Sequence, residues 1–473
     1  MITFCICLLL LILSYFFYGR YIEKIFGADK KREVPSKTSY DGIDYIPMPM
    51  WKTFLIQFLN IAGLGPIFGA ILGAAYGPVV FLWITFGGIL VGAVHDYASG
   101  IISIKNNGLS YPEIIGKYLG NNIKQILRVF TVFLMILVGA LFMVGPAGLL
   151  QGITGLNSTI WIYIILFYYI LATLMPIDKI IGRIYPAFGF ALLFMAVSIL
   201  MVLFFGSYHI PELSVATFTN MKMDAETFPI FPTLFITVAC GAISGFHATQ
   251  SPLMARCVKC ETQGKPVFFG AMITESIVAL IWAAIGLAFF GGVFQLNESL
   301  AEHGNNAAWI VDTIANTTLG KFGAVLALLG VVFAPITSGD TAFRSARLIV
   351  ADFLKIEQKT LRKRMYVSIP LLVAGFIITF LDFDVVWRYF AWANQALAAA
   401  TLWAITVYLA EKRKNIYLTF IPGVFMTMVV SVYFFTSEQM LGLSYYAGLI
   451  ISTVITLVIM AGIWRLINRR YKQ

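Results

Sequence analysis

Long apolar segments separated by short polar loops run the length of the chain. About thirteen of them hold enough consecutive apolar residues, roughly 20 each, to cross a lipid bilayer as a helix. They lie at about residues 2–18, 53–76, 79–104, 126–150, 158–177, 186–206, 232–255, 267–293, 320–350, 366–381, 385–410, 416–436 and 443–467. This pattern predicts an all-α polytopic membrane protein. The segment at 320–350 is too long for one straight helix, so we expect it to be broken, tilted or continued along the membrane surface.

Lysine and arginine are concentrated in alternate loops of this pattern. If all the segments span the membrane, every basic loop falls on one side. The basic loops and tail include Arg20, Lys24, Lys105, Lys124, Arg183, Arg256, Lys265, Lys355, Arg362, Lys412, Arg469 and Arg470. Because basic loops remain in the cytoplasm, we expect a multi-pass protein of the bacterial inner (plasma) membrane, with its N-terminus outside and its C-terminus in the cytoplasm. The first segment lacks the basic start and the cleavage site of a signal peptide, so we expect an uncleaved helix.

The composition excludes a soluble globular protein, because 59% of the 473 residues are hydrophobic and only 12% are charged. The formal net charge of +10 lies in the loops that orient the helices, so it does not indicate nucleic-acid binding. The five cysteines give no disulfide framework. Cys257 and Cys260 have the spacing of a metal-ligand pair, but no second pair accompanies them. We therefore expect no metal and no resident cofactor, and the role of this pair stays open, as does the oligomeric state.

The stretch from Asn60 to Gly77 interrupts its own hydrophobic segment. It contains Gly63, Gly65, Pro66 and Gly69, and proline cannot donate the hydrogen bond that a continuous helix needs. We expect a helix that unwinds near the middle of the membrane, where free main-chain groups are costly unless a ligand or the protein satisfies them. Such breaks form the binding sites of transporters. The alternative is that these glycines only let helices pack closely.

A second interrupted helix is expected at Thr237–Pro252. Its polar positions are Ser244, Gly245, His247, Thr249 and Gln250. It comes five spans after the first interruption and crosses the membrane in the opposite direction, as an inverted repeat requires. We expect a LeuT-like 5+5 inverted repeat with five helices in 53–206 and five in 232–410. The remaining parts are an N-terminal helix and linker (1–52), an external loop (207–231), and two peripheral helices with a basic tail (411–473).

A third polar stretch, within 334–347, supplies a candidate site for a coupling ion. In a five-plus-five repeat this helix approaches the unwound part of the first interrupted helix. The expected ligands are Thr337, Ser338, Asp340 and Thr341, together with main-chain carbonyls at Ile61 and Leu64. Hydroxyl oxygens suit Na⁺, and a buried carboxyl suits a proton carrier. Asp340 could instead pair with Arg344, four residues later.

Other ionisable residues in the spans are candidates for gating or a proton relay. His95, Asp96 and Glu275 are rare residue types inside a membrane and are usually functional, and Arg344 is grouped with them. His247 could bind a carboxylate or take a proton. For each of these side chains, a hydrogen bond that only stabilises helix packing is the alternative.

Four stretches of the chain resemble the carbon starvation (CstA) family. They are GLGPIFGAILGAAYGP (63–78), the segment 82–97 that ends in VHDY, NNGLSYPEIIGKYLG (106–120) and ACGAISGFHATQSP (239–252). The resemblance implies membership of the amino acid–polyamine–organocation superfamily, whose fold is a five-plus-five inverted repeat. It also implies transport, since members of the family are associated with peptide uptake during carbon starvation and others with pyruvate/proton symport.

We therefore expect a secondary active transporter, not an enzyme, that imports a small carboxylate-bearing nutrient such as a peptide or pyruvate. Half-helix N-termini at 63–69 and 245–250 would hold the carboxylate, and H⁺ or Na⁺ would be the coupling ion. The sequence lacks the phosphate-binding motif of nucleotide-driven pumps. The alternatives are a membrane-embedded metal-dependent enzyme using His95, Asp96 and His247, and a starvation sensor that transports nothing.

Overall fold

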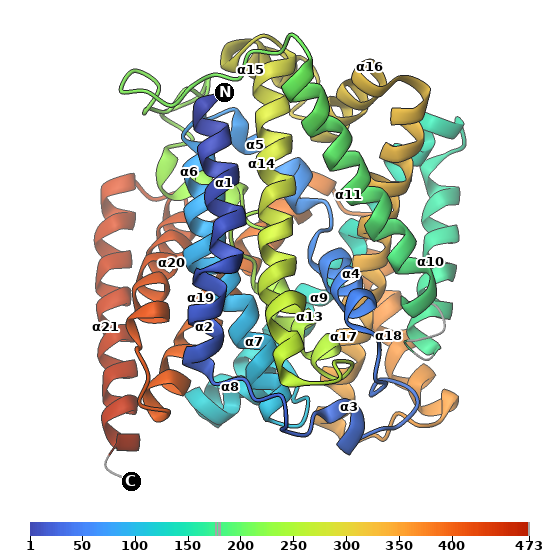
Figure 1. Cartoon of the computed structure of the whole chain (residues 1–473), viewed down its shortest axis with the longest axis vertical. Coiled ribbons are helices and arrows are strands. Elements are labelled where there is room, and N and C mark those ends of the chain that lie inside the picture. Colours follow the sequence, from blue (N-terminus) through green and yellow to red (C-terminus); the bar gives the residue numbers. More distant parts are fainter. Residues whose placement is uncertain (176, 178–180, 472–473) are drawn as a thin grey trace.

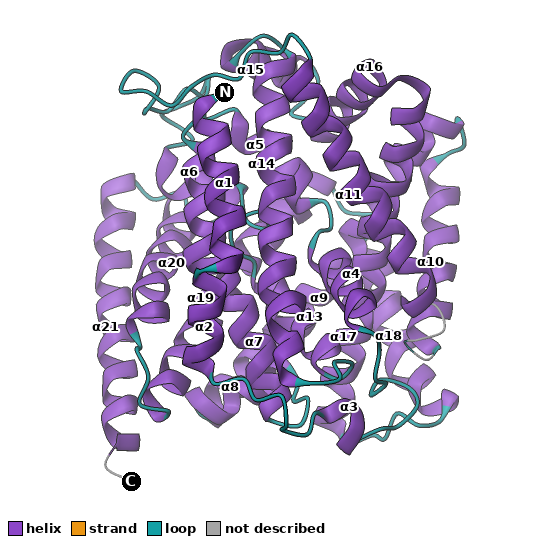
Figure 2. Ribbon diagram, viewed as in Figure 1, coloured by secondary structure: helices purple, strands orange, loops and turns teal. Residues whose placement is uncertain are grey.

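The computed structural model describes residues 1–175, 177 and 181–471, and all regular secondary structure among these residues is helical (Figure 2). The all-α prediction is confirmed for this part of the chain. The N-terminus and the C-terminus lie at opposite ends of the molecule (Figure 1). The end near the C-terminus carries the loops rich in lysine and arginine, and we call it the basic face.

Among the described residues, the first half of the chain forms thirteen helical elements, where η marks a π-helical or 3-10 segment. They are α1 (Ile2–Phe16), α2 (Tyr18–Phe26), α3 (Pro35–Thr38), α4 (Met50–Ile61), η1 (Gly65–Gly69), α5 (Ala70–Ala74), α6 (Val80–Leu82), η2 (Trp83–Gly92), α7 (Ala93–Lys105), α8 (Tyr111–Leu119), α9 (Asn121–Thr154), α10 (Ser158–Leu174) and α11 (Ile181–Phe205).

The second half continues in the same way. Its elements are η3 (Ile230–Leu234), α12 (Phe235–Thr237), α13 (Gly245–Ala255), η4 (Glu261–Gln263), η5 (Lys265–Gly270), α14 (Ala271–Phe289), α15 (Val293–Glu302), α16 (Ala307–Ala327), η6 (Leu328–Val332), α17 (Phe333–Leu354), α18 (Leu361–Ile378), α19 (Phe383–Glu411), α20 (Tyr417–Thr436) and α21 (Tyr445–Tyr471).

Among the described residues, 8 helices are long and apolar enough to cross a membrane, or 9 if one bent pair is a single span. The molecule is therefore a multi-pass membrane protein. The expected number of about thirteen spans stays a prediction, because the other expected spans coincide with shorter or more polar helices, such as α10 and α17. On α21, at the edge of the molecule in Figure 1, the apolar side chains of Ile450, Val454 and Leu457 are exposed at helical spacing, as expected for a lipid-facing helix.

The long segment at 320–350 begins at an irregular residue. Gly320 has non-helical dihedral angles (φ 58°, ψ −149°) inside α16, and the π-helical η6 then connects α16 to α17. A positive φ of this size is accessible to glycine at little cost. From 321 to 354 the chain is helical throughout, so the expected break does not lie within the segment. The tilt and the continuation along the membrane surface stay predictions.

Both predicted interruptions are present. The axes of α4 and of the following η1–α5 pair are bent by 57° at a break after Ile61, where Gly63 is non-helical and Pro66 starts the next helical turns. The second break separates α12 from α13, with residues 238–244 outside any helix. Buried helices α7, α9, α14, α17 and α19 surround the two breaks.

Candidate functional site

The two interrupted helices cross each other at their breaks. Gly65 packs directly on Cys240, leaving no room for a side chain. A Cβ atom on Gly69 would lie 2.8 Å from the carbonyl oxygen of Thr237. As the residue number rises along η1, the number of its partner falls, so the two segments run antiparallel. The glycines therefore allow close packing, which was the alternative interpretation, and they do so at the breaks themselves.

Two adjacent amides of α19 satisfy the main chain at the second break. Asn394 Oδ1 accepts hydrogen bonds from the backbone N–H of Phe246 (2.6 Å) and from Ser244 Oγ (3.0 Å). Gln395 Nε2 donates to the carbonyl oxygen of Ile243 over 3.0 Å. Both amides are fully buried. Neither amide was among the predicted site residues, although two neighbouring amides in an apolar span are a signal that could have identified them.

Several other buried amide atoms near the breaks have no hydrogen-bond partner among the described residues. Both polar atoms of the Asn60 side chain are in this state, as are Gln250 Oε1 and Asn394 Nδ2. An unpaired polar atom in a dry interior is costly, so these atoms are suited to bind a ligand. Asn60, in the last turn of α4, was also missed, whereas Gln250 was predicted.

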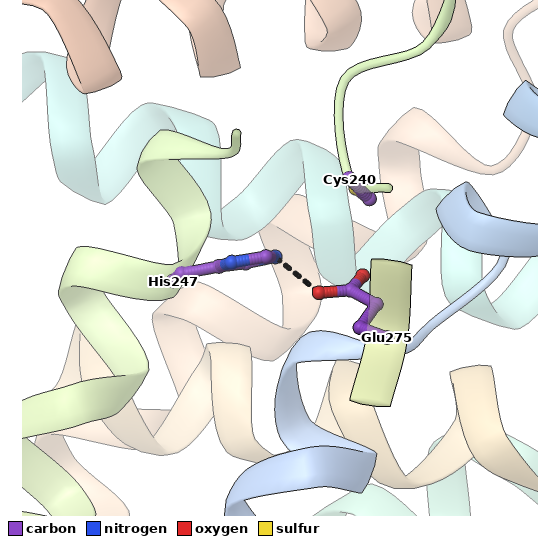
Figure 3. Close-up of side chains that lie close together, drawn as sticks. All are labelled: Cys240, His247 and Glu275. Carbon is purple, nitrogen blue, oxygen red and sulfur yellow. Dashed lines mark ion pairs between the residues drawn. The ribbon is translucent and has the colours of Figure 1, made fainter. Parts of the chain in front are cut away.

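Four ionisable side chains from three helices form one buried chain of contacts. The two oxygens of Asp96 contact His95 Nδ1 (2.7 Å) and His247 Nδ1 (2.8 Å). On its other side, His247 Nε2 lies 3.5 Å from Glu275 Oε2 (Figure 3). All four side chains are fully buried. The structure thus brings together the predicted relay residues on α7 and α14 and the histidine predicted to contact the substrate on α13.

Cys240 extends this chain into a group that could hold a metal ion. One ligand atom each from Cys240, His247 and Glu275 lie within 4.8 Å of one another, and all three residues are buried. Cys257 lies elsewhere, with its Sγ 3.9 Å from the carbonyl oxygen of Asp44. Among the described residues, the Cys257/Cys260 pair contributes to no such group.

The predicted ion-coupling residues of α17 point in two directions. Ser338 Oγ donates to the carbonyl oxygen of Leu59 over 2.7 Å, which joins α17 to the last turn of α4. The Thr337 and Thr341 hydroxyls donate to carbonyls within α17. The carbonyls of Ile61 and Leu64 accept hydrogen bonds from neighbouring main-chain N–H groups in the break.

Asp340 lies on another side of α17. Its Oδ2 accepts a hydrogen bond of 2.5 Å from the Tyr185 hydroxyl of α11, and its Oδ1 has no partner among the described residues. The alternative pairing of Asp340 with Arg344 is not the arrangement found. Arg344 Nη1 instead lies 3.0 Å from Asp44 Oδ1, 300 residues away in sequence.

A buried charge cluster at the basic face joins the linker between α2 and α4 to α17. Asp44, in the linker between α2 and α4, contacts Arg344 and also Arg347 Nη2 (3.1 Å). Burial alone would raise the pKa of Asp44, but Arg347, Arg344 and Arg256 together lower it to about 2. Two further bonds, from Ser36 Oγ to Val258 and from Met48 N–H to Cys257, hold the same linker against the end of α13.

The opposite face has a cavity of about 750 Å³. Its wall includes Phe68 of η1, Gly148 of α9, Trp309 and Asp312 of α16, and Trp387 of α19. The first interrupted helix therefore borders this cavity. A second cavity, of about 510 Å³, lies at the basic face between Tyr45, Arg128 and Arg256.

Comparisons with known proteins agree with the resemblance in sequence. The family model described as "Carbon starvation protein CstA" matches residues 1–154, 144–321 and 306–433. An uncharacterised membrane protein of Haemophilus influenzae is 42% identical over 350 residues, which cover 64% of this chain and 94% of the relative.

Two relatives carry the names of transporters. The peptide transporter CstA of Campylobacter jejuni is 28% identical over 376 residues (64% of this chain, 52% of the relative). The pyruvate/proton symporter BtsT of Escherichia coli is 29% identical over 333 residues (57% of this chain, 46% of the relative). The chain thus spans about half the length of these two relatives.

Among solved structures, a manganese transporter of Eremococcus coleocola matches with a TM-score of 0.53 at 13% sequence identity. The match covers 91% of this chain and 98% of the other. At this identity the match is evidence for a shared fold only.

Proposed function

The chain belongs to the carbon starvation protein CstA family, and from this premise we propose that it is a secondary active transporter that imports a small carboxylate-bearing nutrient, a peptide or pyruvate. Relatives named as a peptide transporter and as a pyruvate/proton symporter support this substrate class. Both are about twice as long as their matched regions, so the substrate has to be tested on this chain.

The observation that carries the proposal is the antiparallel crossing of two interrupted helices in the buried centre. Interrupted main chain at this depth is tolerated where it lines a binding cavity. The amide of Asn60 and the free Nδ2 of Asn394 offer donors to a carboxylate. The first turns at Gly65 and Gly245 add the positive ends of short helical segments.

The finer architecture belongs to the same proposal. We infer a five-plus-five inverted repeat, 53–206 and 232–410, with the basic face in the cytoplasm of a bacterium and the N-terminus outside. The antiparallel crossing of the two breaks supports the repeat, and the alternation of basic loops supports the orientation. The first repeat includes residues 176 and 178–180, and the C-terminal tail includes 472–473, which lie outside the described residues.

We assign the coupling role to Asp340 and infer that the coupling ion is the proton. The Asp340 carboxyl is fully buried, with one oxygen held by Tyr185 and the other unpartnered. A zwitterionic peptide carried in with one proton moves one net elementary charge inward, which gains about 2.3 kcal/mol per 100 mV of membrane potential. Pyruvate with one proton moves no net charge, so its accumulation would be driven by the pH difference alone.

We infer an alternating-access cycle from the difference between the outer face, which has the cavity, and the basic face, which has the Asp44 cluster. The cavity beside Phe68 borders the first interrupted helix on the face that we assign to the outside, and the Asp44 cluster joins the linker to α17 on the cytoplasmic face. Release to the cytoplasm would then require the linker to leave Arg344 and Arg347. Because this linker continues directly into α4, opening it would move the inner half of the first interrupted helix.

The test is uptake into proteoliposomes of the purified protein. Radiolabelled pyruvate and a radiolabelled dipeptide are offered separately, each with an imposed H⁺ gradient, an imposed Na⁺ gradient or neither. We expect concentrative uptake of one of them with the H⁺ gradient. Uptake only with Na⁺ would contradict the assigned ion, and no uptake of either substrate under any gradient would favour a sensor that transports nothing.

A further inference from the structure

The transport mechanism proposed above assigns no role to the buried group formed by Cys240, His247 and Glu275. These residues come from the second break, from α13 and from α14, and Figure 3 shows their side chains converging on one space. We propose that they form a binding site for a zinc ion, with Cys240 Sγ, His247 Nε2 and a Glu275 carboxylate oxygen as ligands. This inference does not depend on what the protein transports.

The surroundings of His247 are those of a metal-bound histidine. Its Nδ1 lies 2.8 Å from an oxygen of Asp96, which leaves Nε2 directed toward Glu275. A histidine that binds a metal almost always gives its second ring nitrogen to a carboxylate or a carbonyl, which fixes the ring and raises its basicity. Asp96 is fixed in turn by its 2.7 Å contact with His95. Helix α7 therefore already supplies the carboxylate that orients His247.

The ligand atoms of His247 and Glu275 lack other partners, whereas Cys240 Sγ lies 3.8 Å from Ser244 Oγ. Neither carboxyl oxygen of Glu275 forms a hydrogen bond within the described part of the chain, and His247 Nε2 forms none either. Both side chains are fully buried. Polar groups so far from water are costly unless something satisfies them, and a cation between them would satisfy both.

The types and spacing of the ligands favour zinc. Thiolate, imidazole and carboxylate together suit Zn²⁺, whereas Mg²⁺ and Ca²⁺ prefer oxygen ligands alone. At ordinary zinc–ligand distances, two ligand atoms of a tetrahedral site lie roughly 3.5 Å apart. His247 Nε2 and Glu275 are already 3.5 Å apart, and all three ligand atoms lie within 4.8 Å. If the side chains rotate so that the ligand atoms move by about 1 Å, all three can bind one ion, and a fourth position is left for water.

The experiment measures metal binding by the full-length protein in detergent, after treatment with a chelator. Calorimetric titration with zinc chloride should give one site per chain. Titration with Co²⁺ should give the near-ultraviolet absorption of a thiolate–cobalt bond. C240S should remove that absorption, and C240S, H247Q and E275Q should each weaken zinc binding by more than about 100-fold. D96N, which alters the carboxylate that contacts His247 and His95 but removes no ligand, should weaken it by about 10- to 100-fold.

The matched control is the double variant C257S/C260S, which removes the other closely spaced thiols and should keep the absorption and the affinity. Melting temperatures without metal show whether each variant is folded. Wild-type protein that binds no zinc would overturn the proposal. So would a folded C240S variant that keeps the absorption, or a control variant that loses it.

Discussion

Asn394 Oδ1 accepts a hydrogen bond of 2.6 Å from the backbone N–H of Phe246, 148 residues earlier in the chain. This contact caps the first turn of α13 with a side chain from α19, because Ser244, the residue before the helix, makes no capping bond of its own. The break in the second interrupted helix is therefore held open by another helix of the core.

Replacing Asn394 with alanine should lower the free energy of unfolding by roughly 1–3 kcal/mol, because the Phe246 N–H is left buried without an acceptor. Uptake should fall with it. The measurement is the melting temperature in detergent, together with uptake in proteoliposomes. The matched control is Asn415→Ala, which removes a similar bond to the backbone N–H of Tyr417 on the exposed surface. Equal effects of the two variants would contradict the role given to Asn394.

The crossing of the breaks predicts that Gly69→Ala is damaging. The new methyl group would lie 2.8 Å from the carbonyl oxygen of Thr237, and forced shifts of this kind cost roughly 1–3 kcal/mol. We expect a lower melting temperature and strongly reduced uptake. Gly462→Ala on α21 is the control, since its added methyl group would have no atom of another described segment within 4 Å. A Gly69→Ala variant as stable and active as this control would show that the breaks do not need to approach so closely.

The buried cluster at the basic face predicts a dependence of stability on pH. The pKa of Asp44 is lowered from an ordinary value of 3.8 to about 2, so its ionised form stabilises the fold above about pH 4, and this contribution is lost as the pH falls toward 2. Asp44→Ala should cost roughly 3–5 kcal/mol at pH 7, because two buried arginines lose their partner.

The measurement is the melting temperature of both proteins at several values between pH 7 and pH 3. The difference between wild type and Asp44→Ala should be constant down to about pH 5 and should narrow below pH 4. A difference that widens on acidification, or no difference at pH 7, would mean that Asp44 is not the ionised partner of Arg344 and Arg347.

The sequence was informative where a single residue type limits the backbone. Proline and closely spaced glycines predicted the break after Ile61, and the polar run from Ser244 predicted the second one. Both are present. The presence of buried relay residues was also foreseeable, since His95, Asp96 and Glu275 are costly in a membrane without partners.

Partners that are distant in sequence could not be predicted in the same way. Arg344 seemed suited to Asp340, four residues away, but its carboxylate partner is Asp44, which the linker brings across the basic face. The contact between Cys240 and Gly65 and the pairing of Asn394 with Phe246 likewise depend on how separate helices pack. Helical spacing determines which residues share a face, but it does not determine which other helix covers that face.

The central claim is that a proton gradient drives uptake through protonation of Asp340, and Asp340→Asn tests it most directly. Asparagine keeps the size of the side chain and an acceptor for the Tyr185 hydroxyl, but it cannot carry a proton. In proteoliposomes with an imposed H⁺ gradient, wild type should concentrate the substrate. The variant should only equilibrate it, while still exchanging labelled for unlabelled substrate. Undiminished accumulation by Asp340→Asn would contradict the account.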